Sequence, residues 1–272
     1  MTTVGSNTST TIDRAVRLLE TIAPVRLAAD WDNVGLLVGD RLRTVARLMT
    51  CLTITGPVVE EALDEKVDLI VAHHPLPFRP LKKLSTDTHE GRLIWRLATA
   101  SVSIYSAHTA FDSAATGINQ AWAEGLGLKK IEPLEAIRAS DDPAIGVGRQ
   151  GEWAGPATLA EVVERVKQFL TIDGLHIVGS ADRKVMRVGI ACGSAGELLE
   201  AAIARRCDLF ITGEARFHTV LEAESADTAM VLVGHYASER FGMERLADQL
   251  AKALPDVAVW ASKRESDPLR WA

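Results

Sequence analysis

The sequence predicts an α/β fold of two related halves, in which mainly parallel sheets form one compact unit. Two observations favour this fold: short apolar runs alternate with amphipathic stretches, and the same order of elements occurs twice along the chain. The chain has 272 residues, of which 47% are hydrophobic, and this is enough to bury a sizeable core.

Helices and strands of the first half follow from periodicity and from stop signals. A helix begins at Ile12, because apolar residues recur on one face from there until Pro24 ends the pattern. Residues 30–40 predict a short strand between two turns. The remaining predicted elements are strands at 45–54, 68–72 and 101–107, and helices at 56–66, 91–100 and about 117–126.

The second half repeats this order. It predicts strands at 185–193, 208–212 and 229–233 and a closing strand at 257–261. The predicted helices are at 197–206, after Glu214 up to about residue 226, and at 239–254. Aligned without a gap, Asp68 meets Asp208, and the same offset of 140 positions brings together seven identical pairs. The alternative is two unrelated units of similar composition, but the matching element order favours a repeat.

The middle of the chain has a different pattern. Residues 141–155 mix glycine with alternating apolar residues, which predicts an antiparallel strand or a hairpin. A helix at 158–170 and a strand at 175–179 follow. We therefore divide the chain into a first α/β half at 1–132, a connecting segment with a small second layer at 133–184, and a second α/β half at 185–272.

Composition and charge exclude several classes of function. The formal net charge is −6 and no run of Lys or Arg occurs, so we expect no nucleic-acid partner. The three cysteines form no Cys-x-x-Cys pair, so we expect reduced, buried, small apolar side chains in a cytoplasmic protein, and no thiolate zinc finger. The polar N-terminus predicts no signal peptide, and no apolar stretch is long enough to predict a membrane partner.

Polar residues gather where the predicted strands end. They are His73 and His74 after 68–72, His108 and Asp112 after 101–107, Glu214 after 208–212, and His235 and Glu239 after 229–233. Each half thus carries a histidine with a carboxylate four positions later, a spacing that puts both on one face if a helix begins there. Because ligands collect outside the carboxyl ends of parallel strands, we expect these groups to converge on one pocket.

Imidazole and carboxylate donors without a thiolate suit zinc, iron, manganese or a similar ion. We predict a two-metal site whose ligands are His73, His74, Asp112, His235 and Glu239. Glu239 is the expected bridge, because each of its two oxygens can contact one metal. Two ions that share a water lower its pKa and yield hydroxide at neutral pH.

Each of these residues also has a structural interpretation, since a histidine at a strand end is often a hydrogen-bonded core or cap residue. His218, four positions after Glu214, is either a substrate-facing base, a partner of a ligand, or a core residue. Arg79, Lys82 and Lys83 form either a solvated loop or contacts for an anionic substrate such as a phosphate.

Four motifs together resemble the NIF-three-like dinuclear metal centre family, some members of which are named type 2 GTP cyclohydrolase I. The motifs are IVAHHPLPFRPLKKL, YSAHTAFD, DLFITGEARFH and VGHYASE, and the resemblance extends from about Ile12 to Val259. It implies an α/β fold of two related halves and a toroidal homohexamer, a trimer of dimers, with metal sites facing an inner cavity.

The resemblance also implies which residues bind two divalent ions per chain. It places His73, Asp112 and Glu239 on one metal, and His74, His235 and the same bridging Glu239 on the other. All five residue types are present, so we expect intact metal binding.

The implied reaction is that of a GTP cyclohydrolase-like hydrolase, in which metal-bound hydroxide attacks the guanine ring of GTP or a related nucleotide. His108 or His218 would move the proton, which makes both candidate catalytic residues. The alternatives are a non-catalytic metal chaperone or store and a regulatory metal-binding protein, neither of which would turn over a nucleotide.

Overall fold

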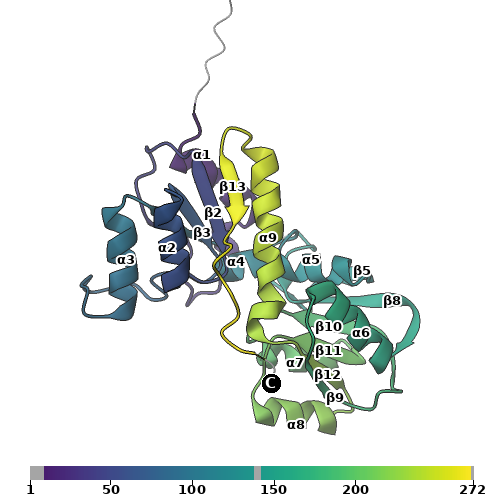
Figure 1. The fold of residues 1–272 in the computed structure, drawn as a ribbon. Coiled ribbons are helices and arrows are strands. Elements are labelled where there is room, and N and C mark those ends of the chain that lie inside the picture. The colour runs from purple at the N-terminus through teal and green to yellow at the C-terminus, as the bar shows by residue number, and fades with distance from the viewer. Residues whose placement is uncertain (1–8, 138–141, 271–272) are drawn as a thin grey trace, which may run out of the picture. The chain divides into compact units, whose positions relative to one another are not determined.

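The computed structural model of the chain describes residues 9–137 and 142–270 (Figure 1). The described residues divide into two compact units. The first comprises the described residues up to Val25, Ala29–His108 and Met243–Ser266, and the second comprises Arg26–Ala28, Thr109–Gly242 and the described residues from Asp267.

The first unit contains one sheet. Its elements are α1 (Ile12–Ile22), β1 (Gly35–Val38), β2 (Arg47–Cys51), α2 (Gly56–Asp64), β3 (Leu69–Ala72), α3 (His89–Thr99), β4 (Ser103–Ser106) and β13 (Ala258–Ala261). The strand order is β1-β4-β3-β2-β13, and every pairing is parallel except that of β1 with β4. The prediction of a mainly parallel sheet is therefore confirmed for this unit.

The core of the first unit lies between its sheet and two helices. Helices α2 and α3 lie side by side next to the sheet (Figure 1). Val58 and Val59 from α2 and Leu97 from α3 are fully buried and belong to one cluster with Ile70 of β3. All four residues of β3 are buried, as expected of a parallel strand covered on both faces, and this explains its continuous apolar run.

A buried carboxylate ties the segment after β13 to α2. Glu61, only 3% exposed, accepts hydrogen bonds from Ser262 Oγ at 2.6 Å and from Trp260 Nε1 at 3.2 Å. The backbone amides of Lys263 and Arg264 donate to it at 3.0 and 2.9 Å. Burial raises the pKa of the Glu61 carboxyl, but these donors outweigh burial and hold the pKa below its ordinary value.

The second unit has more strands and a mixed sheet. Its elements are α5 (Ile118–Gly125), β5 (Lys129–Glu132), β6 (Glu135–Ala136), β7 (Gly146–Val147), β8 (Arg149–Thr158), α6 (Leu159–Leu170), β9 (His176–Val178), β10 (Lys184–Ala191), the 3-10 turn η2 (Gly196–Leu198), α7 (Leu199–Ala204), β11 (Leu209–Thr212), α8 (Phe217–Ser225) and β12 (Ala229–Leu232). Three elements have residues in both units: the 3-10 turn η1 (Val25–Leu27), α4 (His108–Ser113) and α9 (His235–Ala253).

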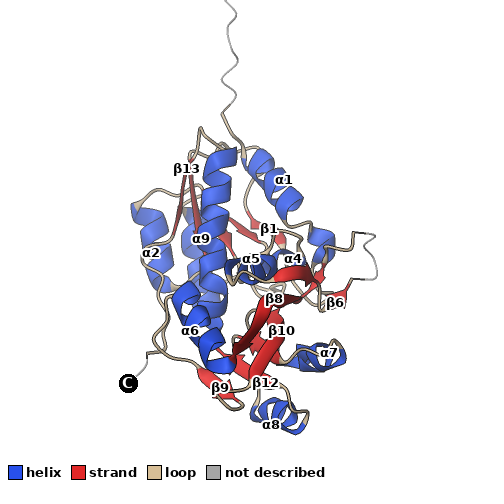
Figure 2. Cartoon of the chain, turned by 90° about the vertical axis from the view of Figure 1, so that its right-hand side faces the viewer, coloured by secondary structure: helices blue, strands red, loops and turns tan. Residues whose placement is uncertain are grey.

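The main sheet of the second unit has the order β5-β8-β10-β11-β12-β9. Its strands β8, β10, β12 and β9 are labelled in Figure 2. Only β10-β11 and β11-β12 pair in parallel, and the three outer pairings are antiparallel. Strands β6 and β7 form a separate two-stranded sheet. Phe210 of β11 and Met230 of β12 are fully buried in a cluster with residues of α7 and α8, which contact β11 and β12.

A fully buried arginine at the start of β8 holds the preceding turn. The five hydrogen bonds of Arg149 go to the carbonyls of Ala114, Ala144, Gly146 and Gly148, at 2.7 to 3.1 Å, and to Gln120 Oε1 at 2.8 Å. Burial lowers the pKa of Arg149 to about 10, so the guanidinium stays charged at neutral pH. Its five N–H groups match these five bonds, as a buried charge requires.

The register of strand pairing repeats between the units. Leu48 pairs with Leu69 in the first sheet, and Val188 pairs with Leu209 in the second, 140 positions later for both partners. Helix α2 and the η2–α7 pair correspond with the same offset. The predicted repeat of two related α/β halves is thus confirmed by the pairing itself.

An aspartate makes the same contact in each repeat. Asp68 Oδ2 accepts a hydrogen bond from the backbone amide of Arg47 at 2.9 Å, and Asp208 Oδ2 accepts one from the amide of Arg187 at 2.8 Å. The identity of these residues at a constant spacing, noted from the sequence, therefore has a physical cause. Each aspartate ties the start of its own strand to the point at which pairing with the parallel neighbour begins.

Several element boundaries differ from those predicted. The helix predicted at 197–206 is divided into η2 and α7, because Leu198 has a ψ of 0°. The strand predicted within 141–155 extends further, as β8, and pairs with two neighbours, while Asp141 lies outside the described residues. Asp112 lies within the short helix α4, which was not among the predicted elements, and the last helix begins at His235, not at Glu239.

The two compact units do not coincide with the predicted ranges 1–132, 133–184 and 185–272. The segment 133–184 supplies β8, α6 and β9 to the second unit. Met243–Ser266 belongs to the first unit, because β13 extends the first sheet by pairing with β2. A segment near the C-terminus therefore adds a strand to the sheet that the N-terminal residues form.

Helix α9 has 19 residues, and charged side chains occur along it. Within the ranges 9–137 and 142–270, no helix combines the length and the apolar character needed to cross a membrane.

Replacing Glu61 with Gln should lower the free energy of unfolding by about 1–3 kcal/mol, because an amide leaves one of the buried donors without an acceptor. Denaturant unfolding at pH 7 measures this difference. Because folding depresses the pKa of Glu61, its contribution is present above the ordinary value of 4.5 and is lost as the pH falls through the folded-state value. The difference between the two proteins should therefore shrink in acid.

The neighbouring variant Glu60→Gln is the matched control. Glu60 is 52% exposed and contacts Arg96 at 2.7 Å, so its loss should change stability much less than the loss of Glu61. Equal losses in the two variants would contradict an anchoring role for Glu61.

Candidate metal centre

Histidines follow the carboxyl ends of two neighbouring strands in the first unit. His73 and His74 come directly after β3, and His108 comes two residues after Ser106, the end of β4. Because β3 and β4 are parallel neighbours, both ends reach the same edge of the sheet. The His108 amide donates to the His73 carbonyl at 3.2 Å, and Ser106 Oγ donates to the same carbonyl at 2.7 Å.

The three imidazoles form a compact cluster. His73, His74 and His108 each offer one ring nitrogen within 4.8 Å of the other two. Their ring centroids are 5.2 to 5.5 Å apart. His73 is fully buried and His108 is 9% exposed, so these are not solvated surface groups. Three neutral imidazoles at this spacing could hold a metal ion.

Two of these rings are oriented through Nδ1 by side chains from other segments. Thr53 Oγ1 lies 2.7 Å from Nδ1 of His74, and Asp32 Oδ1 lies 2.8 Å from Nδ1 of His108. The Asp32 side chain is completely buried. A contact at Nδ1 sets the tautomer and leaves Nε2 as the nitrogen that would face a metal, which is the usual arrangement of metal-binding histidines.

The backbone at His108 is strained. Its φ is 25°, a value that residues other than glycine rarely adopt. The contacts of its amide with His73 and of its ring with Asp32 hold it there. Strain of this kind persists only where the surrounding contacts impose it, and it is concentrated at functional sites.

The second unit carries its polar residues at the equivalent edge of its sheet. Strands β10, β11 and β12 are parallel, so their carboxyl ends also lie together. Cys192 follows β10 directly, Glu214 follows β11 by two residues, and His235 follows β12 by three.

His235 lies between two carboxylates. Its Nε2 is 3.1 Å from Glu239 Oε2, one turn later on α9, and its Nδ1 is 2.9 Å from Glu214 Oε1. The Glu239 side chain is 4% exposed, whereas that of Glu214 is 55% exposed. The prediction that His235 and Glu239 share one helix face is confirmed. The role of Glu214, open from the sequence, is to contact the other nitrogen of the same ring.

These carboxylates change the acidity of the imidazole between them. The hydrogen bond that His235 donates to Glu239 raises the pKa of His235 to about 9, burial opposes this shift, and Glu214 adds to it. In the metal-free protein His235 is therefore protonated at neutral pH. A metal ion that bound its Nε2 would have to displace that proton.

Asp112 lies on α4 within a small hydrogen-bonded group. Cys192 Sγ donates to Asp112 Oδ1 at 3.2 Å, and the Cys192 amide donates to Asn119 Oδ1 at 2.8 Å. Burial raises the pKa of the Cys192 thiol, and the charges of Asp112 and Glu239 raise it further. Cys192 is buried, as the sequence predicts, but it is also a neutral donor to a candidate ligand, which composition alone does not predict.

The Glu239 carboxylate fits against a glycine. Gly193 has a φ of 69°, and a Cβ built on it would lie 2.3 Å from Glu239 Oε1. The Gly193 amide donates to Ser238 Oγ at 2.8 Å, and this hydroxyl donates to the His235 carbonyl at 2.6 Å. The turn after β10 therefore requires a glycine both for its backbone conformation and for the space occupied by the carboxylate.

Other residues singled out from the sequence lie apart from these contacts. His218 is exposed on the first turn of α8, with its ring centroid 6.1 Å from that of Phe217. Arg79, Lys82 and Lys83 are exposed in the loop between β3 and α3. A catalytic role for His218 stays a prediction.

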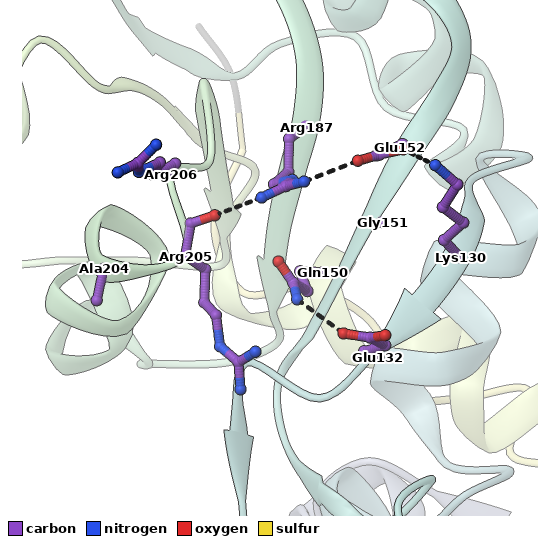
Figure 3. A pocket seen from close by; sticks show the side chains of 9 residues that line it. All are labelled: Lys130, Glu132, Gln150, Gly151, Glu152, Arg187, Ala204, Arg205 and Arg206. Carbon is purple, nitrogen blue, oxygen red and sulfur yellow. Dashed lines mark hydrogen bonds and ion pairs between the residues drawn. The ribbon is translucent and has the colours of Figure 1, made fainter.

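A hollow of about 400 Å³ in the second unit lies beside β8 and β10 (Figure 3). Its lining residues are Lys130, Glu132, Gln150, Gly151, Glu152, Arg187, Ala204, Arg205 and Arg206. Glu152 lies 2.8 Å from both Lys130 and Arg187 and so compensates their charges. The guanidinium groups of Arg205 and Arg206 point in different directions (Figure 3). Because the cations do not converge, we do not assign an anion site to this hollow.

Comparisons with known proteins agree with this architecture. The profile of the family Duf34/NIF3 (NGG1p interacting factor 3) matches residues 10–268. The chain is 33% identical over 261 residues to the GTP cyclohydrolase 1 type 2 homolog of Clostridium acetobutylicum, across 93% of this chain and 96% of that protein. It is also 33% identical over 260 residues to NIF3-like protein 1 of Drosophila melanogaster, across 93% and 87% of the two chains.

Solved structures with the same fold include a Staphylococcus aureus hypothetical protein, with a TM-score of 0.87 and 25% identity over 97% of this chain and 100% of that one. Reduced HcgD from Methanocaldococcus jannaschii has a TM-score of 0.80 and 26% identity, over 93% and 98% of the chains.

In the metal-free protein, the His235 ring should titrate near pH 9, and Glu239→Gln should bring its pKa down toward 6.5. The NMR shift of the ring protons against pH measures both values. Because folding raises this pKa, the pair stabilises the fold fully below pH 6.5, and this contribution is lost as the pH rises through about 9. A wild-type titration near 6.5 would contradict the contact with Glu239.

Gly193→Ala should displace the Glu239 carboxylate and lower the His235 pKa in the same titration, because the added methyl group occupies the place of Glu239 Oε1. Gly127→Ala is the matched control. Gly127 also has a positive φ, of 79°, but nothing lies within 4 Å of the position that a Cβ would take there, so that variant should leave His235 unchanged. Equal effects of the two variants would show that backbone strain alone, and not crowding of Glu239, is responsible.

Proposed function

The chain belongs to the Duf34/NIF3 family, and from this premise we propose that it is a metal-dependent hydrolase whose dinuclear centre acts on a purine nucleotide. Two lines of argument support the proposal. The described residues hold imidazole and carboxylate groups that could bind a metal ion. Relatives with about one third identity carry the name GTP cyclohydrolase 1 type 2 homolog.

The proposed ligands are the five residues singled out from the sequence. His73, Asp112 and Glu239 would hold one ion. His74 and His235 would hold the other together with Glu239, which would be shared by both ions. This set of nitrogen and oxygen donors, without a thiolate ligand, is typical of zinc, iron(II) or manganese.

The observation that carries the proposal is the orientation of the imidazoles. His74, His108 and His235 each have Nδ1 against a side-chain oxygen, 2.7 to 2.9 Å away. Such a contact sets the tautomer of the ring and fixes the direction in which the opposite nitrogen points. Three independent segments supply these oxygens, which is more orientation than isolated cap or core histidines require.

When bound, two divalent ions would lower the pKa of a shared water and so supply a nucleophile at neutral pH. The residues of the chain would orient the substrate and move protons. We assign proton transfer to His108, because the buried Asp32 at Nδ1 keeps a proton there and leaves Nε2 as the basic atom. His218 is the second candidate, but its exposed place on α8 gives it no comparable partner within the described contacts.

Assembly and location are further parts of the proposal. We infer a homohexamer, which size-exclusion chromatography with light scattering would detect as about six times the 29.4 kDa chain mass. We infer a cytoplasmic location, which the three buried cysteines support because none of them forms a disulfide.

Metal analysis of the purified chain tests the centre directly. We expect about two ions per wild-type chain after reconstitution, about one in His74→Ala, and a large loss in Glu239→Ala because the bridge contacts both ions. His89→Ala, which alters an exposed histidine at the start of α3, is the control and should keep both ions. No tight metal in the wild type, even with zinc, manganese or iron(II) supplied, would refute the centre.

Turnover of GTP by the loaded protein tests the reaction. We expect activity that chelation abolishes, and His108→Ala should lower kcat by about 10²–10⁴-fold through loss of proton transfer. If metal is bound but no purine nucleotide is turned over, the hydrolase proposal fails and a non-catalytic metal-handling role replaces it.

A further inference from the structure

Two aromatic rings lie against His108 in the first unit. Trp31 and Phe78 have their ring centroids 6.0 Å apart, with an angle of 33° between their planes. Both meet His108 edge-on, at 5.8 Å for Trp31 and 6.0 Å for Phe78. The rings therefore lie against the one imidazole to which proton transfer is assigned above.

These rings are exposed although they are large and apolar. Trp31 is 64% exposed and Phe78 is 44% exposed. An exposed aromatic pair beside convergent polar groups is typical of a ligand-binding site, because the rings offer apolar area while the polar groups set orientation. The core of the first unit does not account for this placement, since neither ring belongs to the main cluster.

The two loops that carry the rings are tied together. Asn33 Nδ2 donates to the Pro77 carbonyl at 2.8 Å, which links the residues beside Trp31 to those beside Phe78. Asp32, between Trp31 and Asn33, contacts His108. One short segment thus orients the imidazole and presents the indole, so the ring pair has a defined position relative to the histidine cluster.

A group of cations follows Phe78 in the same loop. Arg79, Lys82 and Lys83 are exposed. They give the loop a local positive charge in a chain whose net charge is −6. A guanidinium and two ammonium groups on a loop suit the phosphates of a ligand.

We propose that Trp31 and Phe78 bind the planar base of a nucleotide by stacking, while Arg79, Lys82 and Lys83 contact its phosphates. The inference rests on the proposed function, since it names how the same centre would recognise its substrate. Stacking on an indole face tolerates any base, so this surface accounts for the class of ligand, and the groups around His108 would account for the choice of base.

The test measures binding to the full chain in two forms, metal-free and metal-loaded, by calorimetry with guanosine and with GTP as probes. Wild type should bind both, GTP more tightly and with the stronger dependence on salt. Trp31→Ala should weaken the binding of both probes by about tenfold or more. The double variant Lys82→Ala/Lys83→Ala should weaken only the binding of GTP.

Trp95→Ala is the matched control, because Trp95 is 49% exposed but lies on α3. It should leave both affinities unchanged. Equal effects of Trp31→Ala and Trp95→Ala, or no guanosine binding by either form of the wild type, would overturn the stacking surface. So would a changed assembly mass with unchanged affinity in Trp31→Ala, since the rings would then cover a second copy of the chain.

Metal content is measured on the same samples, which separates this inference from the proposed function. Two bound ions without any binding of guanosine would remove the stacking surface and leave the metal centre standing. If the protein binds no metal but still binds guanosine in a way that depends on Trp31, the metal centre is refuted and the stacking surface stands.

Discussion

The parallel register between β3 and β4 is the constraint on which the histidine cluster depends. Ala72 pairs with Ser106, so the residues that follow leave adjacent strands at the same level. A slip of one residue would turn every side chain of β4 to the other face of the sheet. It would also separate the amide of His108 from the carbonyl of His73. Strand pairing therefore determines where the histidines lie relative to one another.

Much of this arrangement could be predicted, because burial leaves a clear pattern. A parallel strand covered on both faces is a continuous apolar run, so the polar residues after it mark both its end and the edge where ligands collect. That reasoning located His73, His74, His108 and His235 at strand ends, and the structure agrees. The repeat could be predicted for a related reason: Asp208, like Asp68, ties together two parallel strands where their pairing begins.

The partners of these residues could not be predicted, because local patterns do not encode contacts between distant segments. Asp32 lies 76 positions from His108, and Cys192 lies 80 positions from Asp112. Thr53 is an ordinary polar residue in a turn until folding brings it to His74. The predicted helix at 197–206 was wrong for a local reason, because a single residue with ψ near zero is enough to divide a helix.

Arg149 has a consequence for how this chain tolerates change. Its acceptors before β8 are backbone carbonyls, which any residue offers, so most side chains of the turn 142–148 are of little importance to it. Gly146 and Gly148 are exceptions, because a Cβ on Gly146 would meet a carbonyl oxygen at 2.3 Å and Gly148 has a φ of 59°. Removing a residue would instead withdraw carbonyls from a buried charge, which is costly. Apart from these glycines, the turn should therefore tolerate substitutions but not insertions or deletions. An ordinary surface loop, by contrast, tolerates changes of length.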